Sequence, residues 1–357
     1  MAFVTLDIKK LHSNFNYLNS FFQKHGIEWS VVSKLLSGNK LFLTELLKFD
    51  IKQVCDSRTS NLKEIKSINP EIETIYIKPP PKRAIASVVK YADISMNTEI
   101  ETIKLLSQEA KKQHKVHKII IMIELGELRE GVLGENFIHF YENIFKLENI
   151  EVVGLGTNLT CLYGVLPNHD KLIQLSLYKQ LIEAKFNKQI LYVSGGSSVT
   201  IPLIFQNLLP KGINHFRVGE TLFLGTDVYN NSKIKRMQSD VFMLYSEIIE
   251  LIKKQVVHNG DMDTNVEGES YELDKTKIGK KTYRAILDLG LLDTEIHHLY
   301  FTYKTLKFVC ASSDMIVVDL GDNVKKYKVG DLIEIKMDYM GTLRIMNSKY
   351  IEKRLKP

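Results

Sequence analysis

The chain has 357 residues, of which 44% are hydrophobic and 25% are charged, and its formal net charge is +6. These fractions exclude disorder as the main state, because the chain has ample apolar side chain to bury in a core. A transmembrane helix is also excluded, since the longest apolar runs, such as Ile119–Ile123, fall far short of the ~20 residues that span a bilayer. The length exceeds that of one average domain and predicts two.

Charge and cysteine usage point to an ordinary cytoplasmic protein. The densest basic stretch is formed by Lys111, Lys112, Lys115 and Lys118, which we interpret as a solvated helix face rather than a nucleic-acid site. The three cysteines are widely separated and form no CxxC pair, which is typical of a reducing compartment. The N-terminus lacks the basic and apolar segments of a signal peptide. We therefore expect a cytoplasmic protein that binds neither nucleic acid, membrane nor metal.

Hydrophobic periodicity predicts a regular alternation of helices and strands up to about residue 218. Apolar residues from Ile8 to Phe22 recur every three or four positions, which predicts a first helix that ends near Gly26. The segments expected to form strands are 29–33, 51–55, 72–77, 91–95, 116–124, 150–156, 189–194 and 213–218. The segments expected to form helices between them are 38–49, 60–67, 80–90, 98–113, 134–147, 169–186 and 198–208.

This alternation predicts a (β/α)8 TIM barrel in an α/β fold. Strands such as Lys118–Ile123 are continuous apolar runs, which is the pattern of a parallel sheet buried on both faces. An open doubly wound sheet is the alternative. After about residue 235 the pattern changes to short β-type runs separated by turn signals such as Gly321-Asp322-Asn323. We expect a barrel domain of residues 1–235 and a C-terminal β domain of residues 236–357.

Barrel enzymes carry their chemistry at the C-terminal ends of the strands. The first strand ends in Lys34. A lysine in a barrel mouth is partly desolvated, which lowers the pKa of its amine and favours Schiff-base formation. A solvent-facing lysine without a chemical role is the alternative.

The ends of the seventh and eighth strands suit a phosphate group. The seventh strand runs into Ser194-Gly195-Gly196-Ser197-Ser198, where glycines allow close backbone approach and the hydroxyls of Ser197 and Ser198 lie beside exposed amides. The eighth runs through Arg217 into Gly219 and Glu220. Phosphate sites of barrels often lie in these two loops. A plain glycine turn, and a structural ion pair for Arg217, are the alternatives.

Two further loops at the same end of the barrel are polar. Arg129 lies in a glycine-containing loop after the fifth strand and could hold a carboxylate through its guanidinium, unless it is a simple surface arginine. The sixth strand ends in a polar segment that contains Asn158. One lysine, one phosphate cradle and one anion-binding arginine together suggest pyridoxal 5′-phosphate as the cofactor. Residues 1–235 would then be the cofactor-binding domain.

As a set, these motifs resemble the alanine racemase-like, fold-type III pyridoxal-phosphate family, and within it the ornithine racemase-type amino acid racemases. The resemblance rests on the following segments, in order: Val32-Ser33-Lys34 with Gly38-Asn39, Cys55–Arg58, Asp93–Glu99, Glu124–Gly131, Gly156–Cys161, Ser194–Ser198, Ile213–Glu220 and Ala311–Asp314. The family implies a barrel followed by a β domain, in a head-to-tail homodimer that acts on an amino acid.

The resemblance also implies a role for each site residue. Lys34 would carry the cofactor as a Schiff base and exchange the α-proton on one face of the substrate. The residues implied to bind the cofactor are Ser198, Gly219 and Glu220 at the phosphate, Arg217 at the pyridine nitrogen and Asn158 near the ring. Arg129 would hold the substrate carboxylate.

The chain departs from the family pattern where a second proton donor is needed. Alanine racemases use a tyrosine from the partner's C-terminal domain, and this chain has Leu291 and Leu292 in that stretch. Met315 follows Asp314 where the ornithine racemase-type pattern has histidine. Asp314 is therefore the candidate for the second base, and a turn residue is its alternative role.

These departures leave three functional hypotheses. The first is a two-base amino acid racemase, with ornithine or another diamino acid as one candidate substrate. The second is a pyridoxal-phosphate-binding protein without turnover, which serves carriage or regulation. The third is a Schiff-base aldolase that acts on a sugar phosphate.

Overall fold

A computed structural model of the chain describes residues 2–264, 268, 270, 272 and 274–356. The chain divides into two compact units. One is Ile8–Ser239, and the other combines the described parts of Met1–Asp7 and Asp240–Pro357.

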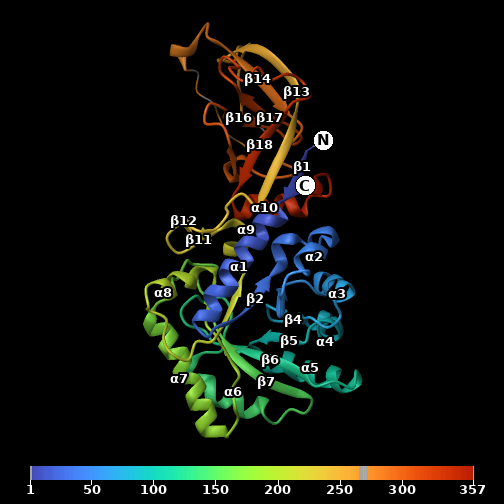
Figure 1. Cartoon of the computed structure of the whole chain (residues 1–357), viewed down its shortest axis with the longest axis vertical. Coiled ribbons are helices and arrows are strands. Elements are labelled where there is room, and N and C mark those ends of the chain that lie inside the picture. Colours follow the sequence, from blue (N-terminus) through green and yellow to red (C-terminus); the bar gives the residue numbers. More distant parts are fainter. Residues whose placement is uncertain (1, 265–267, 269, 271, 273, 357) are drawn as a thin grey trace. The chain divides into compact units, whose positions relative to one another are not determined.

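The unit Ile8–Ser239 is a parallel β-barrel surrounded by helices (Figure 1). Its strands are β2 (Glu28–Val32), β3 (Gln53–Asp56), β4 (Glu73–Tyr76), β5 (Ile94–Asn97), β6 (His117–Met122), β7 (Ile150–Gly156), β8 (Tyr192–Ser194), β9 (Gly196–Ser197) and β10 (His215–Val218). They are hydrogen-bonded in the order β8-β7-β6-β5-β4-β3-β2-β10-β9. The two ends of this order, β8 and β9, are separated in the chain only by Gly195, so the sheet is a nearly closed barrel. The predicted barrel is confirmed, and the open doubly wound sheet was the wrong alternative.

The helices follow the expected alternation. They are α1 (Ile8–Lys24), α2 (Lys40–Leu46), α3 (Thr59–Ile68), α4 (Ile85–Tyr91), α5 (Ile100–Lys112), α6 (Phe137–Ile144), α7 (His169–Phe186), α8 (Ile201–Phe205) and α9 (Glu220–Leu224). A short antiparallel pair, β11 (Thr226–Asp227) and β12 (Ser232–Lys233), follows α9. The stripe predicted for the first helix is confirmed, because Leu11, Phe15, Leu18 and Phe22 are all buried in α1.

The barrel interior is a packed apolar core. The buried cluster is drawn from the seven strands β2 to β8 and consists of Val32, Cys55, Ile75, Ile94, Met96, Ile120, Met122, Val153 and Tyr192. Burial raises the pKa of the Cys55 thiol to about 12, so this cysteine is a packing residue rather than a nucleophile. A filled interior confines chemistry to the mouth of the barrel, where the strands end.

In its described residues, the second unit is a mainly antiparallel sheet accompanied by one α-helix. Its elements are β1 (Phe3–Leu6), β13 (Phe242–Gln255), β14 (Lys281–Leu287), β15 (Leu299–Phe301), β16 (Lys307–Ala311), β17 (Ile316–Asp319), β18 (Leu332–Met337), α10 (Tyr339–Asn347) and β19 (Glu352–Leu355). The sheet order is β15-β18-β13-β14-β17-β16, and β1 lies between β13 and β19. The predicted C-terminal β domain is therefore confirmed.

The first strand differs from the expected domain division. The sequence predicts that residues 1–235 form the barrel domain, whereas Phe3–Leu6 pairs antiparallel with β13 and parallel with β19 in the other unit. A strand of four residues carries no local signal of its partner, because its two neighbours lie more than two hundred positions along the chain.

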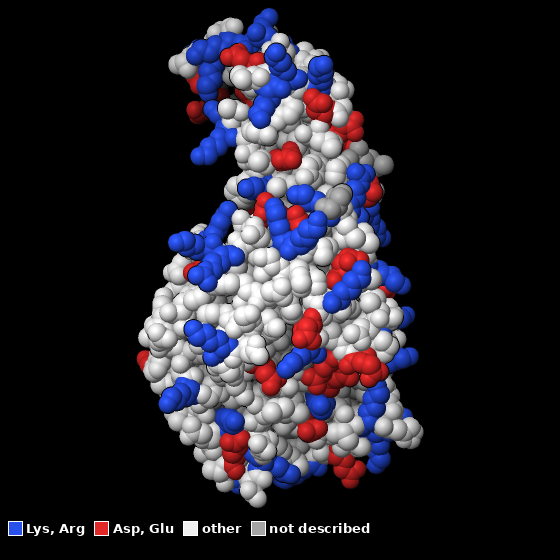
Figure 2. Space-filling view, in the orientation of Figure 1, with Lys and Arg blue, Asp and Glu red and all other residues white. Residues whose placement is uncertain are grey.

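The basic stretch on and after α5 has acidic or backbone partners. The amines of Lys111, Lys112 and Lys118 lie 3.6, 3.8 and 3.6 Å from the carboxylates of Glu148, Glu109 and Glu73. Figure 2 shows basic and acidic side chains intermingled on its visible face. Among the described residues, no helix combines the length and apolar character needed to cross a bilayer.

Candidate active site

The predicted site residues of the barrel lie at or beyond the C-terminal ends of its strands. Lys34 belongs to a single-turn helix, Ser33–Leu36, directly after β2. Arg129 follows β6, Asn158 follows β7, and Ser197 and Ser198 lie at β9 and just after it. Arg217 is in β10, and Gly219 and Glu220 come directly after that strand. Because parallel strands share one polarity, all of these positions lie at the same end of the barrel.

Arg217 is a buried arginine with fixed partners. Its Nη2 donates to the backbone oxygen of Thr157 at 2.7 Å and to Oδ1 of Asn158 at 2.9 Å. Its Nη1 donates to the Met96 sulfur at 3.1 Å. Burial lowers the pKa of Arg217, yet an arginine stays charged at any physiological pH. The site therefore holds a guanidinium that only neutral or anionic groups can approach favourably.

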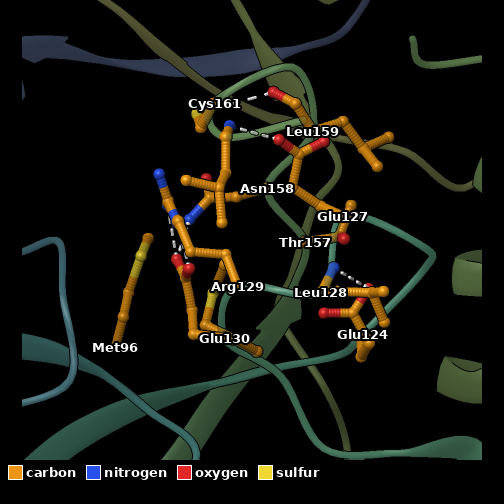
Figure 3. Close-up of polar contacts among 12 residues, drawn as sticks. Met96, Glu124, Glu127, Leu128, Arg129, Glu130, Thr157, Asn158, Leu159 and Cys161 are labelled. Carbon is orange, nitrogen blue, oxygen red and sulfur yellow. Dashed lines mark hydrogen bonds and ion pairs between the residues drawn. The ribbon is translucent and has the colours of Figure 1, made fainter. Parts of the chain in front are cut away.

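Arg129, Glu130 and Asn158 form a hydrogen-bonded group (Figure 3), which the Asn158 amide oxygen joins to Arg217. Both carboxylate oxygens of Glu130 accept hydrogen bonds from Arg129, through Nε and through Nη2. The Asn158 amide also donates to Glu130 Oε1. Glu130 was not singled out from the sequence, although it is the direct neighbour of Arg129. The missing information was the position of Asn158, 28 residues further along the chain.

Glu127 holds the loop that follows Asn158. Its buried carboxylate accepts backbone N–H groups of Thr160, Leu162, Tyr163 and Val165. These bonds outweigh burial and hold the pKa of Glu127 below its usual value. One carboxylate thereby fixes the loop that directly follows Asn158 and contains Cys161.

The glycine–serine bend connects two loops at the barrel mouth. The Ser198 hydroxyl accepts the Thr221 backbone N–H at 3.2 Å, which joins the loop after β9 to the start of α9. The Ser197 side chain accepts the Thr200 N–H, and the Ser197 N–H donates to the Thr200 hydroxyl. At Gly196 an added Cβ would lie 2.2 Å from ring atoms of the buried Phe216. The bend can therefore pass over β10 only with glycine at this position.

Replacing Gly196 with alanine should destabilise the barrel by about 3 kcal/mol, because a rigid buried ring cannot move aside. Gly195→Ala is the matched control, since its Cβ would meet only methyl ends of Leu172, Ile213 and Leu175 at 3.0 to 3.2 Å. Urea unfolding followed by fluorescence of Trp29, the chain's one tryptophan, measures the free energy of unfolding of the barrel in both variants. An equal loss of stability in the two variants would contradict this account of the bend.

Lys34 is exposed, so the partial desolvation predicted for its amine is not observed, while the residue before it is firmly held. The Ser33 hydroxyl donates to the buried Asp56 carboxylate at 2.9 Å. Asp56 also accepts the Arg58 backbone N–H and the Asn61 amide. Burial raises the pKa of Asp56 despite these bonds. The single-turn helix that carries Lys34 is thus anchored at its first residue to the end of β3.

The remaining predicted positions lie together in the second unit. Asp314 is exposed in the turn between β16 and β17. The backbone N–H groups of Leu291 and Leu292 donate to the carbonyls of Ser312 and Ser313 at 2.9 and 3.0 Å. Leu292 and Met315 are 67% and 40% exposed, so this small surface is apolar around one carboxylate.

A group of potential metal ligands also lies in the second unit. One ligand atom from each of Glu295, His297 and His298 falls within 4.8 Å of the others. Arg344 already pairs with Glu295, and Asp338 lies 2.8 Å from the His298 Nδ1. Because these two residues already have partners, we interpret the group as a polar network around the start of α10.

Comparison with known proteins identifies the family. Residues 6–227 match the family described as alanine racemase, N-terminal domain. The chain is 38% identical to ornithine racemase of Acetoanaerobium sticklandii, over 99% of both chains. It is 30% identical to lysine racemase of Thermotoga maritima, over 99% of this chain and 98% of that protein.

A solved structure agrees with the fold. Alanine racemase of Bartonella henselae, determined with covalently bound pyridoxal phosphate, superposes with a TM-score of 0.74 at 17% identity, over 99% of both chains. The sequence resemblance is confirmed, and the comparisons support the racemase hypothesis over carriage or regulation without turnover. The chain therefore belongs to the alanine racemase family of amino acid racemases.

Proposed function

We propose that the protein is a pyridoxal-phosphate-dependent racemase of a basic amino acid, with ornithine or lysine as substrate. The observation that carries this proposal is the likeness over nearly the full chain to one racemase of ornithine and one of lysine. The two relatives' substrates share an α-amino acid head and a terminal amine, which defines the substrate class.

The residues at the barrel mouth fit the cofactor. The Ser198 hydroxyl and the neighbouring backbone of Gly219 and Glu220 lie on the two loops that Ser198 joins, and they would hold the phosphate. Gly196 leaves the bend without a side chain where its backbone passes close to the Phe216 ring. When bound, pyridoxal phosphate supplies an electron sink that acidifies the α-hydrogen of an amino acid.

The side chains of the chain would divide the remaining work. The Lys34 amine would hold the cofactor's aldehyde carbon and move a proton to and from the substrate α-carbon on one face. Arg129 would bind the substrate carboxylate, and Asn158 would lie near the cofactor ring. Arg217, fixed by Thr157 and Asn158, would face the pyridine nitrogen and keep it from gaining a proton.

Racemisation needs a proton donor on the second face as well. We propose that Asp314 of the partner in a head-to-tail homodimer supplies it. The exposed Leu292 and Met315 support an interface there, because apolar side chains beside a carboxylate are typical of a surface that a partner covers. The cysteines Cys55, Cys161 and Cys310 are free thiols, which supports a cytoplasmic location.

The test is solvent exchange in D2O with the cofactor-loaded protein and each enantiomer of ornithine and lysine. We expect product of inverted configuration that carries deuterium at the α-carbon, measured by chiral chromatography and mass spectrometry. Exchange without inversion would contradict a second proton donor. No exchange with any amino acid would instead support the carrier hypothesis.

A further inference from the structure

We propose that Glu130 is a positioning residue, which orients Arg129 and Asn158 together so that the exposed part of the Arg129 guanidinium can receive the substrate carboxylate. This inference rests on the proposed function, because it takes Arg129 as the residue that binds the carboxylate. Glu130 itself contacts neither substrate nor cofactor in this proposal.

The first step is the geometry of the ion pair. Glu130 accepts from Arg129 Nε and from Arg129 Nη2, the latter at 2.6 Å, which is a two-point contact along one edge of the guanidinium. A guanidinium has five N–H donors in a rigid plane, so a contact along one edge sets the direction of the other edge. The Glu130 side chain is 11% exposed and that of Arg129 is 36% exposed. The anchor is therefore enclosed, while the arginine remains open to a ligand.

The second step is the orientation of the Asn158 amide. Its nitrogen donates to Glu130, and its oxygen accepts from Arg217 at 2.9 Å. An amide placed between a carboxylate and a guanidinium has only one favourable orientation, since the reverse would face donor to donor and acceptor to acceptor. Asn158 thus links Glu130 to Arg217 by hydrogen bonds. Together with Arg129, these side chains form one hydrogen-bonded series from the proposed carboxylate site to the proposed cofactor site.

The third step is charge. Arg129 and Arg217 lie close enough for the charge of Arg129 to lower the pKa of Arg217, while Glu130 raises it. The two arginines in turn help to hold the pKa of Glu130 below its usual value, so Glu130 is ionised at neutral pH. One anion between two cations reduces their mutual repulsion and lets both remain in place.

Glu130→Gln distinguishes the orienting role of the Glu130 carboxylate from simple packing, because glutamine has nearly the same size and shape. Every polar group around the Glu130 carboxylate is a donor, and the amide nitrogen of glutamine would oppose one of them. We expect Arg129 to lose its fixed direction. KM for the amino acid should rise roughly tenfold to a hundredfold, while kcat changes by less than about threefold. The exposed Glu135→Gln, in the same connection between β6 and α6, removes the same charge and should leave both constants unchanged.

A second readout does not depend on turnover. Butyrate, a carboxylate without an amine, should bind the holoenzyme in an NMR titration with a dissociation constant that rises in Glu130→Gln and not in Glu135→Gln. In a double-mutant cycle for butyrate affinity, Glu130→Gln and Asn158→Ala should be non-additive, because both act on one hydrogen-bonded group.

The outcomes separate the two proposals. Wild-type protein without racemisation of any amino acid would overturn the proposed function, while the butyrate titration would still test Glu130. An active wild type with unchanged KM and butyrate affinity in Glu130→Gln would overturn the inference alone. The inference would also be overturned if Glu130→Gln lowers the free energy of unfolding but leaves KM and the butyrate affinity unchanged.

Discussion

Lys34→Ala should abolish racemisation, with a loss of at least about 10³-fold in kcat. Two functions disappear in this variant: the amine that holds the cofactor's aldehyde and the base that moves the α-proton on one face. The visible absorbance that pyridoxal phosphate gains on joining the protein amine should also disappear. Chiral chromatography and absorption spectra of the purified variant measure the two losses independently.

The control for this variant is Lys40→Ala. Lys40 is a nearby exposed lysine at the start of α2, where it pairs with Glu64 at 3.5 Å. This variant should keep both the absorbance and the turnover, because a surface ion pair contributes little to stability. Retention of the absorbance in Lys34→Ala would show that another amine carries the cofactor, and the assignment of Lys34 would then be lost.

Most of the barrel could be predicted from the sequence because its signals are local. The strand His117–Met122 is an apolar run between two polar segments, and the helix His169–Phe186 begins after Asn168, whose side chain caps it. Each such element is recognisable within ten to twenty residues. Parallel pairing then follows from the alternation itself, since a helix between two strands returns the chain to the same end of the sheet.

The elements that escaped prediction depend on distant partners or broken patterns. In β13, Phe242, Leu244 and Ile248 face inward, but Ser246 occupies a buried position in the same row. A register shift between Ile248 and Glu250 then interrupts the alternation. The spacing of Glu250 and Lys254 favours a helix instead, and the two side chains form an ion pair on the strand.

The same contrast holds in the site. Lys34 and Arg217 could be proposed because each lies near the end of a strand that is visible in the sequence. Glu130 and the Thr157 carbonyl could not, because their roles come from contacts with residues 28 and 60 positions away. A backbone carbonyl also has no signature in a sequence at all. Side chains at strand ends are thus predictable as a set, whereas the hydrogen bonds that orient them need the structure.

The barrel should lose stability already below pH 6.5, well above the range in which carboxylates titrate. His215 is buried in the barrel, where its Nδ1 lies 2.7 Å from the Ser194 hydroxyl and its Nε2 lies 3.1 Å from Gln53 Oε1. Burial, together with the charge of the nearby Arg217, lowers the pKa of His215 to about 3. Burial likewise lowers the pKa of His117 to about 4. Both imidazoles are therefore neutral in the folded barrel.

The direction of the effect follows from proton linkage. Below pH 6.5 the unfolded chain binds protons at both imidazoles and the folded barrel does not, so the free energy of unfolding falls as the pH falls. Each histidine contributes up to about 1.4 kcal/mol per pH unit until its folded form titrates near pH 4 or 3. Between pH 6.5 and 4.5 the expected loss is several kcal/mol.

Urea unfolding at a series of pH values between 7.5 and 4.5, followed by Trp29 fluorescence, measures this slope in the barrel unit. His215→Gln cannot gain a proton and should reduce the slope by about half, whatever it costs at pH 7.5. His139→Gln is the control, because His139 is on the exposed side of α6 and should leave the slope unchanged. A free energy of unfolding that stays constant from pH 7.5 to 5 would mean that the buried imidazoles take up protons in the folded barrel as readily as in the unfolded chain.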